Sequence, residues 1–195
     1  MKTVIVVPEK CVGCKQCLIA CAVEHSQSKD LFASLSERVQ PRPRLRVYPG
    51  MNHFAFVNKC RHCDPAPCQV VCMPGAISHD PVRGTTDIDL HRCISCGMCA
   101  MACPFGVLRF APTLAAPEKK SVALKCDQCP DREKEGRPPA CVEACKVGAL
   151  LYDTPDEAMV RKGLRVSRSV FASLQGAEGL GTPVPPQIRL WRHLV

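Results

Sequence analysis

The chain has 195 residues, of which 46% are hydrophobic and 5% aromatic, and its formal net charge is +8. This length allows one or two small domains, and the scarcity of aromatic side chains indicates modest hydrophobic cores. No apolar run approaches the roughly 20 residues that a transmembrane helix requires, so we expect no membrane span. The basic surplus suits an acidic partner or a nucleic acid, or else it is a solvated basic surface.

Sixteen cysteines dominate the sequence, and they fall into four groups of four with none left over. The groups are Cys11, Cys14, Cys17, Cys21; Cys60, Cys63, Cys68, Cys72; Cys93, Cys96, Cys99, Cys103; and Cys126, Cys129, Cys141, Cys145. Groups one and three have the spacing C-x2-C-x2-C-x3-C, which supplies the thiolate ligands of [4Fe-4S] clusters. The fourth cysteine of such a run ligates the other cluster in two-cluster ferredoxins. All sixteen cysteines are therefore predicted ligands, enough for four [4Fe-4S] clusters.

Three other kinds of cysteine site fit this pattern less well. Disulfides are typical of secreted chains, but the first apolar run is too short for a signal peptide and Cys11 follows almost at once. Structural zinc uses similar C-x2-C pairs, yet it seldom needs a third cysteine two residues later and a fourth after three more. A radical-enzyme cluster leaves one iron open and needs three cysteines, whereas these groups are complete.

In chain order, a short strand-like segment precedes each cysteine group. These leading segments are residues 3–7, 53–57, 86–90 and 121–124. A second strand-like segment follows groups two, three and four, at residues 75–78, 106–110 and 148–152. A glycine or proline just after the cysteines, such as Pro104 or Gly148, suits the sharp turn into that segment. The repeat is that of ferredoxins, and it occurs twice.

Group one departs from this repeat. After Cys21 the sequence runs through residues 22–29 into a stretch rich in proline and arginine, residues 41–49, where we predict no strand. Such a break fits the insertion of one module, made of groups two and three, into another made of groups one and four. Within group four, the polar residues 130–139 are predicted to form a solvated loop or a docking loop for a catalytic subunit.

The composition changes after Tyr152, where Thr154, Pro155 and Glu157 form a helix start with a capping box. We expect a helix to about Gln175, with one apolar stripe that packs on its own domain and one basic side. The stripe consists of Val160, Leu164, Phe171 and Leu174, and the basic side of Arg161, Lys162, Arg165 and Arg168. The proline-rich residues 183–191 are predicted to be an extended tail that lies on the protein or is captured by a partner.

Basic residues lie beside several cysteines, namely Lys10, Lys15, Arg61, Arg92 and Lys125. Positive charge there favours the reduced state of a cluster, and ordinary solvated side chains are the alternative. Four clusters of about −2 each offset the net charge and leave the loaded protein close to neutral. Of the six histidines, His62 and His91 are candidates for hydrogen bonds to sulfur, and the others are expected to be structural or surface residues.

On these motifs the chain resembles the four-cluster iron–sulfur subunits that accompany molybdopterin oxidoreductases, formate- and hydrogen-metabolising complexes, and nickel carbon monoxide dehydrogenases. The resemblance covers residues 1–153. It is carried by residues 59–68 (KCRHCDPAPC), by residues 88–99 and by the long spacer between Cys129 and Cys141. Within that family, residues 21–26 followed by Ser28 and Lys29 look most like the electron-transfer subunit of carbon monoxide dehydrogenase.

The resemblance implies an α+β fold of two ferredoxin-like dicluster modules, one inserted in the other, with a C-terminal helix and an extended tail. The outer module corresponds to residues 1–30 with 115–153, the inserted module to residues 50–114, and the extension to residues 154–195. It also implies four ligand sets, which are Cys11, Cys14, Cys17 with Cys145; Cys126, Cys129, Cys141 with Cys21; Cys60, Cys63, Cys68 with Cys103; and Cys93, Cys96, Cys99 with Cys72.

The expected function is electron transfer rather than catalysis, because no substrate pocket is indicated. We expect a hetero-oligomer that passes electrons from a catalytic subunit, carbon monoxide dehydrogenase in the first place, to a downstream acceptor such as a hydrogenase or flavoprotein. A molybdopterin, formate dehydrogenase or hydrogenase complex is the alternative partner. A zinc-binding structural or nucleic-acid-binding module is the alternative of another class. Reducing chemistry and the missing signal sequence favour the cytoplasm.

Overall fold

The computed structural model describes residues 1–50, 54–114, 116 and 121–174. The chain divides into two compact units, one formed by Thr3–Tyr152 with Met1 and the other by Asp153–Val195 with Lys2. All sixteen cysteines lie in the first unit. Among the described residues, no helix is both long enough and apolar enough to cross a bilayer.

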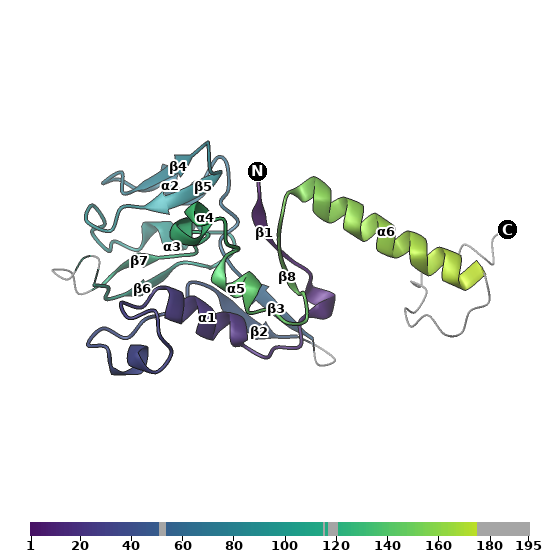
Figure 1. Cartoon of the computed structure of the whole chain (residues 1–195). Coiled ribbons are helices and arrows are strands. Elements are labelled where there is room, and N and C mark those ends of the chain that lie inside the picture. The colour runs from purple at the N-terminus through teal and green to yellow at the C-terminus, as the bar shows by residue number, and fades with distance from the viewer. Residues whose placement is uncertain (51–53, 115, 117–120, 175–195) are drawn as a thin grey trace. The chain divides into compact units, whose positions relative to one another are not determined.

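The first unit alternates short strands with short helices (Figure 1). Its strands are β1 (Thr3–Val6), β2 (Arg46–Pro49), β3 (Ala55–Asn58), β4 (Ile77–Asp80), β5 (Thr85–Ile88), β6 (Arg109–Ala111), β7 (Val122–Leu124) and β8 (Leu150–Asp153), which ends at the unit boundary. Its helices are α1 (Gln16–Glu24), α2 (Pro67–Val70), α3 (Met98–Ala102), α4 (Pro130–Lys134) and α5 (Ala140–Glu143), with 3₁₀ turns η1 (Pro8–Lys10) and η2 (Ala33–Ser36). The expected mixture of α and β structure is confirmed, and each of the seven expected strands is present.

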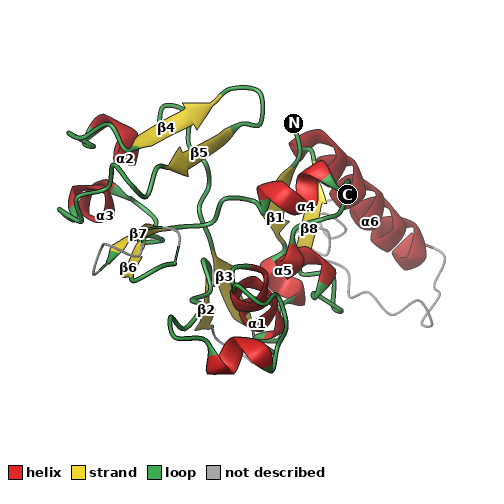
Figure 2. Cartoon of the chain, turned by 60° about the vertical axis from the view of Figure 1, so that its left-hand side comes forward, coloured by secondary structure: helices red, strands yellow, loops and turns green. Residues whose placement is uncertain are grey.

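Within the described residues, the strands pair into four two-stranded sheets: β1 with β8, β2 with β3, β4 with β5, and β6 with β7. The last three pairs are antiparallel, and Figure 2 shows them as separate ribbons joined by loops. In their registers Val47 lies opposite Val57, and Phe110 lies opposite Ala123. Isolated two-stranded sheets are only marginally stable in water, so other groups must hold this unit together.

Strand β2 contradicts one sequence prediction, because we expected no strand in the stretch rich in proline and arginine. The physical reason lies at the end of each cysteine group. Groups two, three and four carry a glycine three residues after the last cysteine, and Gly75, Gly106 and Gly148 have φ of 61°, 58° and 63°. Group one carries Glu24 at that position, inside α1. The helix therefore continues past Cys21, and the chain reaches its strand only at Arg46.

The helices pack in two pairs, α1 against α5 and α2 against α3. Helix α1 carries Cys17 and Cys21 of group one, and α5 carries Cys141 of group four. In the other pair, α2 carries Cys68 of group two and α3 carries Cys99 of group three. Cysteine groups that are far apart in the sequence are thus brought together by helix packing.

The buried core of the first unit is built from small side chains and cysteines. Among the described residues of this unit, nine of the buried non-polar residues are cysteines and eight are alanines. One core cluster gathers Val4, Leu45, Val57 and Leu150 around cysteines of groups one and four, and a second gathers residues such as Ile77 around groups two and three. A third, small cluster joins Cys60, Val107 and Cys126.

The second unit contains α6 (Pro155–Leu174), which begins where the sequence predicts. The hydroxyl oxygen of Thr154 accepts a hydrogen bond from the Glu157 N–H at 3.2 Å, and the Glu157 carboxylate accepts one from the Thr154 N–H at 2.9 Å. This is the expected capping box.

The packing of the apolar stripe on its own domain stays a prediction. Val160, Leu164 and Phe171 are each more than half exposed on α6. The side chain of Leu174, the helix end near Gln175 and the proline-rich tail lie outside the described residues.

Candidate iron–sulfur cluster sites

Each cysteine group forms a tight loop through a left-handed backbone conformation directly before its second cysteine. The residues at that position are Gly13, His62, Ser95 and Gln128, with φ of 71°, 51°, 59° and 61°. A positive φ is uncommon outside glycine, so its recurrence at four equivalent positions shows that the four loops share this turn. The turn reverses the direction of the chain just before the second cysteine of each group.

Two cavities are each lined by four cysteines drawn from two groups. One of them is lined by Cys11, Cys14, Cys17 and Cys145, which we call set A, and its free space, with the open solvent at its mouth included, is about 330 Å³. The other is lined by Cys72, Cys93, Cys96 and Cys99, which we call set D, and its free space measured in the same way is about 340 Å³. In both sets, one group supplies three cysteines and a distant group supplies the fourth.

Two further groups of cysteines lie close together. We call Cys21, Cys126, Cys129 and Cys141 set B; burial raises the pKa of Cys141 well above its usual value, and the thiols of Cys126, Cys21 and Cys129 raise it further. Cys60, Cys68 and Cys103 form the other group, and together with Cys63, which the predicted ligand set adds to them, we call them set C. Burial raises the pKa of Cys68, and the thiols of Cys60 and Cys103 lie close enough to add to this shift.

At least one backbone N–H group in each set points at a cysteine sulfur. The donors and their distances to Sγ are Ala149 to Cys145 (3.2 Å) in set A, Arg44 to Cys21 (3.2 Å) in set B, His62 to Cys60 (3.4 Å) in set C and Ala123 to Cys93 (3.5 Å) in set D. Such donors stabilise negative charge on sulfur. Four soft sulfur atoms with this support fit the ligand requirement of a [4Fe-4S] cluster in every set.

Without a bound cation, these sites disfavour thiolates. Burial raises the pKa of Cys17 and of Cys99 to about 11 and that of Cys129 to about 12, and neighbouring thiols add to the effect. Because a metal ligand must be a thiolate, a positively charged group has to compensate for this loss of hydration. Binding of iron therefore releases protons and is coupled to the packing of the core.

The histidine ring that lies near a cysteine sulfur belongs to His25, which the sequence analysis did not name as a candidate for such a contact. The Nδ1 atom of His25 lies 2.7 Å from the Cys21 carbonyl oxygen and 3.8 Å from the Cys21 sulfur, and its Nε2 atom lies 3.2 Å from Asp127. Although burial raises the pKa of Asp127, this hydrogen bond and the charge of Arg44 hold that pKa below its ordinary value. No signal in the sequence indicates this contact, because only the fold brings residues 25 and 127 together.

His62 acts differently from the prediction. Its ring Nδ1 accepts a hydrogen bond from the Thr86 N–H at 3.1 Å, and its backbone N–H, not its ring, donates to the Cys60 sulfur. Burial is the main cause that lowers the pKa of His62 to about 3, so the ring is neutral at physiological pH. At His91, the backbone N–H donates to the Asp89 carboxylate at 2.9 Å.

The polar spacer of group four is not simply a solvated loop. It contains helix α4, and Arg132 of that helix is only 7% exposed. The Arg132 guanidinium pairs with Glu24 of α1 at 2.9 Å and with Glu143 of α5. Through these ion pairs, the spacer connects the two helices, α1 and α5, that carry cysteines of sets A and B.

The basic residues next to cysteines fall into two kinds. Lys10, Lys15 and Arg92 are exposed, and Arg61 lies over the rings of Phe56 and Phe105 at 5.8 Å and 5.4 Å. Lys125, by contrast, is 4% exposed. Lys59, which the sequence analysis did not single out as a charge, is 2% exposed.

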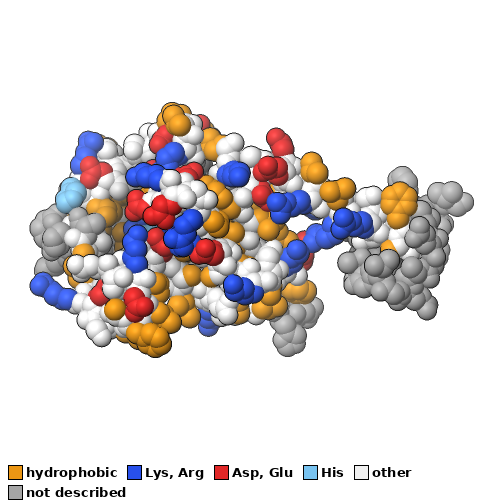
Figure 3. Space-filling view, in the orientation of Figure 1, with side chains coloured by type: hydrophobic (Ala, Val, Ile, Leu, Met, Phe, Trp, Pro, Cys, Tyr) orange, Lys and Arg blue, Asp and Glu red, His pale blue; other side chains and the backbone are white. Residues whose placement is uncertain are grey.

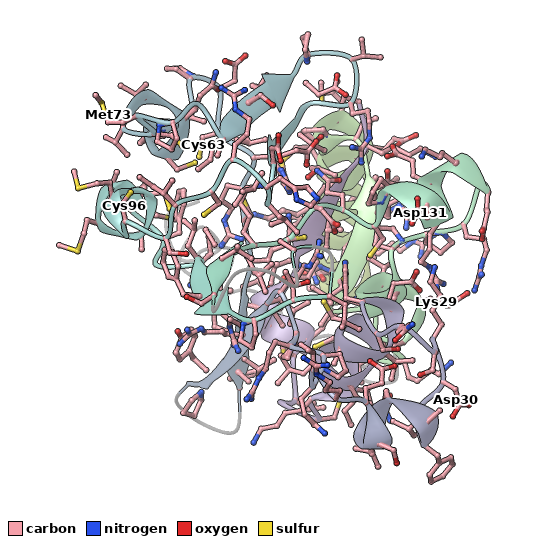
Figure 4. The ribbon with its side chains drawn as sticks, turned by 90° about the vertical axis from the view of Figure 1, so that its left-hand side faces the viewer. Lys29, Asp30, Cys63, Met73, Cys96 and Asp131 are labelled. Carbon is pink, nitrogen blue, oxygen red and sulfur yellow. The ribbon has the colours of Figure 1, made fainter. Side chains whose placement is uncertain are left out.

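Sets A and D each reach the surface at one cysteine. Cys14 of set A and Cys96 of set D are exposed, whereas all four cysteines of set B are buried. Figure 4 shows Cys96 together with Cys63 and Met73 at one end of the first unit. An exposed ligand position offers a short path to a partner.

Two family models match this sequence. Residues 51–154, more than half of the chain, match the model described as a 4Fe-4S dicluster domain. Residues 8–24, which contain group one, match a second model described as a 4Fe-4S binding domain. The chain belongs to the 4Fe-4S dicluster domain family. Its expected iron–sulfur chemistry is thereby confirmed at the level of [4Fe-4S] binding.

Curated relatives of this dicluster family member are electron carriers. They include the electron transport protein HydN of Escherichia coli (37% identical; 73% of this chain and 82% of the relative are covered) and the thiosulfate reductase electron transfer subunit PhsB of Salmonella typhi (36%; 79% and 76%). The B subunit of the anaerobic dimethyl sulfoxide reductase of Escherichia coli is 35% identical, with 79% and 74% covered. These names describe electron-transfer components, so the prediction that the chain is an electron-transfer subunit rather than a catalytic one is confirmed. None of the three names mentions carbon monoxide dehydrogenase, and that finer resemblance stays a prediction.

Proposed function

We propose that this chain holds four [4Fe-4S] clusters and relays electrons through them between the catalytic subunit of an oxidoreductase and a downstream acceptor. The observation that carries the proposal is the composition of sets A and D, each of which surrounds one cavity with three cysteines from one group and one from another. Sets B and C follow the same three-plus-one rule. One cluster for each set uses every cysteine of the chain.

The cysteines are the proposed ligands, and the surrounding residues support them. When bound, each cluster supplies one site that accepts and releases a single electron. Around each site, backbone N–H groups stabilise charge on sulfur, and buried alanines and valines exclude water. Exclusion of water and the number of N–H···S hydrogen bonds are the means by which a protein adjusts cluster potentials.

The proposed order of the relay is set A, set B, set C, set D. Its support is the contact between neighbouring sets: the thiol of Cys17 in set A raises the pKa of Cys141 in set B, after burial and closer thiols. Cys60 of set C and Cys126 of set B share one buried core cluster. The thiol of Cys68 in set C likewise adds to the raised pKa of Cys99 in set D.

We also propose that the unit consists of two ferredoxin-like modules, one inserted in the other, with boundaries at residues 1–30 and 115–153 for the outer module and 50–114 for the inserted one. Residues 154–195 then form the extension. The packing of α1 on α5 and of α2 on α3 supports this division, and so does the pairing of β1 with β8 and of β4 with β5. Strand pair β6–β7 joins the two modules, and β2, in the segment between residues 30 and 50, pairs with β3 of the inserted module.

For the catalytic partner, carbon monoxide dehydrogenase is the expectation from sequence. The residues that carry that expectation make contacts within the chain itself. His25 contacts Asp127, the Ser26 hydroxyl donates a hydrogen bond to the Val23 carbonyl at 2.6 Å, and the Ser28 hydroxyl donates one to the Glu37 carboxylate at 2.7 Å. They shape the segment after group one, so they carry no direct information about a partner.

The number of clusters is tested by the iron and sulfide content of the full-length chain, purified without oxygen or reconstituted. Four clusters correspond to about sixteen irons per chain, together with the spin-coupled paramagnetic spectrum of several reduced cubanes. About eight irons with full sulfide would instead indicate two clusters and contradict the assignment. A colourless, zinc-containing protein would refute the relay altogether.

The partner is tested separately, by anaerobic isolation of the tagged chain from its native cells and an assay of the complex for carbon monoxide-dependent dye reduction. A nickel–iron partner with that activity would support carbon monoxide dehydrogenase. A molybdopterin or hydrogenase subunit without it would keep the relay and replace the partner.

A further inference from the structure

A basic residue stands directly before the first cysteine of every group. These residues are Lys10, Lys59, Arg92 and Lys125. Lys10 and Arg92 are exposed, whereas Lys59 is 2% exposed and Lys125 is 4% exposed. At this position of the repeat, the positive charge therefore lies in solvent in groups one and three and in the protein interior in groups two and four.

The two buried lysines make the same local contact. The Lys59 Nζ atom donates a hydrogen bond to the Cys60 carbonyl at 3.0 Å, and the Lys125 Nζ atom donates one to the Cys126 carbonyl at 3.3 Å and a second to the Thr86 carbonyl. Within the described ranges, no carboxylate forms an ion pair with either lysine. An ammonium group buried without a carboxylate is costly unless other negative charge compensates it.

That negative charge is sulfur, and the lysines reach it across the boundary between two sets. Burial lowers the pKa of Lys59, and the thiol of Cys126 in set B is the first of the neighbouring groups that oppose this shift. For Lys125 the two sets are exchanged: it lies next to Cys126 of set B, and its charge lowers the pKa of Cys68 in set C against the effect of burial. Each lysine directly precedes a cysteine of one set, Cys60 or Cys126, and because these two cysteines lie in one buried cluster its charge also reaches the other set.

The place where they act is the junction of sets B and C, where Cys60, Val107 and Cys126 pack together. Two neighbouring sites that both gain negative charge repel each other when one of them accepts an electron. A fixed positive charge between them offsets this repulsion, and inside a protein it is screened far less than a charge in water. Exposed Lys10 and Arg92 do not have that advantage.

We propose that Lys59 and Lys125 are a crossed pair of positioning residues whose buried positive charges raise the reduction potentials of the set B and set C sites, so that electrons pass between the two modules. The proposal rests on the proposed cluster assignment. It adds that electron transfer between set B and set C, the second step of the relay, depends on these two lysines, and that the equivalent residues Lys10 and Arg92 have no comparable effect.

The test is a redox titration of the full-length, cluster-loaded chain followed by electron paramagnetic resonance, for Lys59→Met and Lys125→Met. Both substitutions keep a long apolar side chain and remove the charge. In each variant, one or two midpoint potentials should fall by at least about 59 mV. For a one-electron couple, this shift corresponds to a tenfold lower ratio of reduced to oxidised sites at a given potential. The other midpoints should stay within error.

Matched controls are Lys10→Met and Arg92→Met, which remove charge at the same repeat position on the surface and should shift potentials less than tenfold. Wild-type midpoints in iron-complete Lys59→Met and Lys125→Met, or shifts no larger than in the controls, would overturn the proposal. A wild-type chain without four cubanes would instead refute the cluster assignment, so the two failures are distinguishable.

A second pair of variants covers the case in which the methionine variants lose iron. Lys59→Arg and Lys125→Arg keep the charge but change the shape of the side chain. Retention of iron and of wild-type potentials in the arginine variants would support the need for charge. Loss of iron in both kinds of variant would assign the lysines a packing role and contradict the proposal.

Discussion

Cys21 is the last cysteine of group one in the sequence but lies with group four in space. It is buried and its sulfur accepts a hydrogen bond from the Arg44 N–H. Burial raises the pKa of Cys21, and the thiols of Cys126 and Cys129 add to this shift. Cys17, one turn earlier in α1, faces Cys11, Cys14 and Cys145 instead. Two cysteines on one short helix thus belong to different sets.

This placement leads to a prediction about single cysteine substitutions. Cys21→Ser and Cys141→Ser should alter the same paramagnetic signal, because both sulfurs belong to set B, while Cys17→Ser should alter another. The measurement is the spectrum and iron content of each variant, with about a quarter of the iron affected in each case. Identical changes in Cys21→Ser and Cys17→Ser would contradict the crossed assignment.

Tyr152 gives a pH prediction. Burial, and then the hydrogen bond that its hydroxyl donates to Glu133 at 3.0 Å, raise the pKa of Tyr152 to about 12. An unperturbed tyrosine has a pKa of about 10. Because the folded state holds the phenol proton more tightly, the stabilisation is complete below pH 10 and is lost as the pH rises from about 10 through about 12.

The check is the ultraviolet titration of tyrosinate in Tyr48→Phe, which leaves Tyr152 as the only tyrosine of the two. Its midpoint should lie near 12 and should fall when Glu133→Gln is added. A midpoint near 10 in the folded Tyr48→Phe chain would contradict both the burial of Tyr152 and its hydrogen bond to Glu133.

At the scale of elements, the glycine after each later cysteine group turns the chain from a cysteine loop into a strand. Gly106 has φ of 58°, and a Cβ atom added to it would meet nothing within 4 Å, so substitution there reports backbone strain alone. Gly163 also has open space around it but lies inside α6. The same substitution should therefore have opposite effects at the two positions.

Gly106→Ala should destabilise the first unit by about 1–2 kcal/mol, because alanine is strained in the left-handed region. Gly163→Ala should stabilise α6 by about 1 kcal/mol, because alanine has the higher helix propensity. Anaerobic urea unfolding, followed by visible absorbance of the clusters and by far-ultraviolet circular dichroism, separates the two effects. Equal shifts of the same sign would argue that the φ of residue 106 is not positive in solution.

At the scale of the whole molecule, the first unit has little conventional core. Cysteines and alanines make up most of its buried non-polar residues, and its sheets are two strands wide within the described ranges. Apolar burial of this extent rarely stabilises a small domain without a metal or disulfide staple. We therefore expect the clusters to supply a large part of the folding free energy.

Removal of iron by an anaerobic chelator should unfold the first unit. The expected result is loss of strand signal in circular dichroism and rapid proteolysis within Thr3–Tyr152, reversed when iron and sulfide are restored. Protein kept in the same buffer without chelator is the control. An apo chain that keeps its strand signal and protease resistance would show that the small core is sufficient.

The distribution of charged side chains is a second property of the whole molecule. Figure 3 shows acidic and basic side chains intermixed on the visible face of the first unit. Within this unit, Arg83 forms ion pairs with Asp87 and Glu133, and Arg132 with Glu24 and Glu143. On this face the basic side chains form no continuous stripe of the kind that binds nucleic acid. We expect bound clusters, which are anionic with their thiolates, to offset the net charge of +8.

The sequence by itself determined the chemistry of this protein, because ligand type and loop spacing are local properties. Cysteines at intervals of two residues predict a [4Fe-4S] site, alternation predicts the short strands, and Thr154 with Glu157 predicts the start of α6. The repeat around Cys60 and Cys93 was sufficient to predict electron transfer. None of these features depends on which distant segments meet.

Only the tertiary structure decided which cysteines share a cavity, that a strand forms at Arg46–Pro49, and that Lys59 and Lys125 are buried while Lys10 and Arg92 are not. These outcomes depend on the packing of α1 on α5 and of α2 on α3, which joins segments more than one hundred residues apart in the first case. Four basic residues at one repeat position look alike in the sequence. Burial separates them, since it determines how strongly water screens each charge.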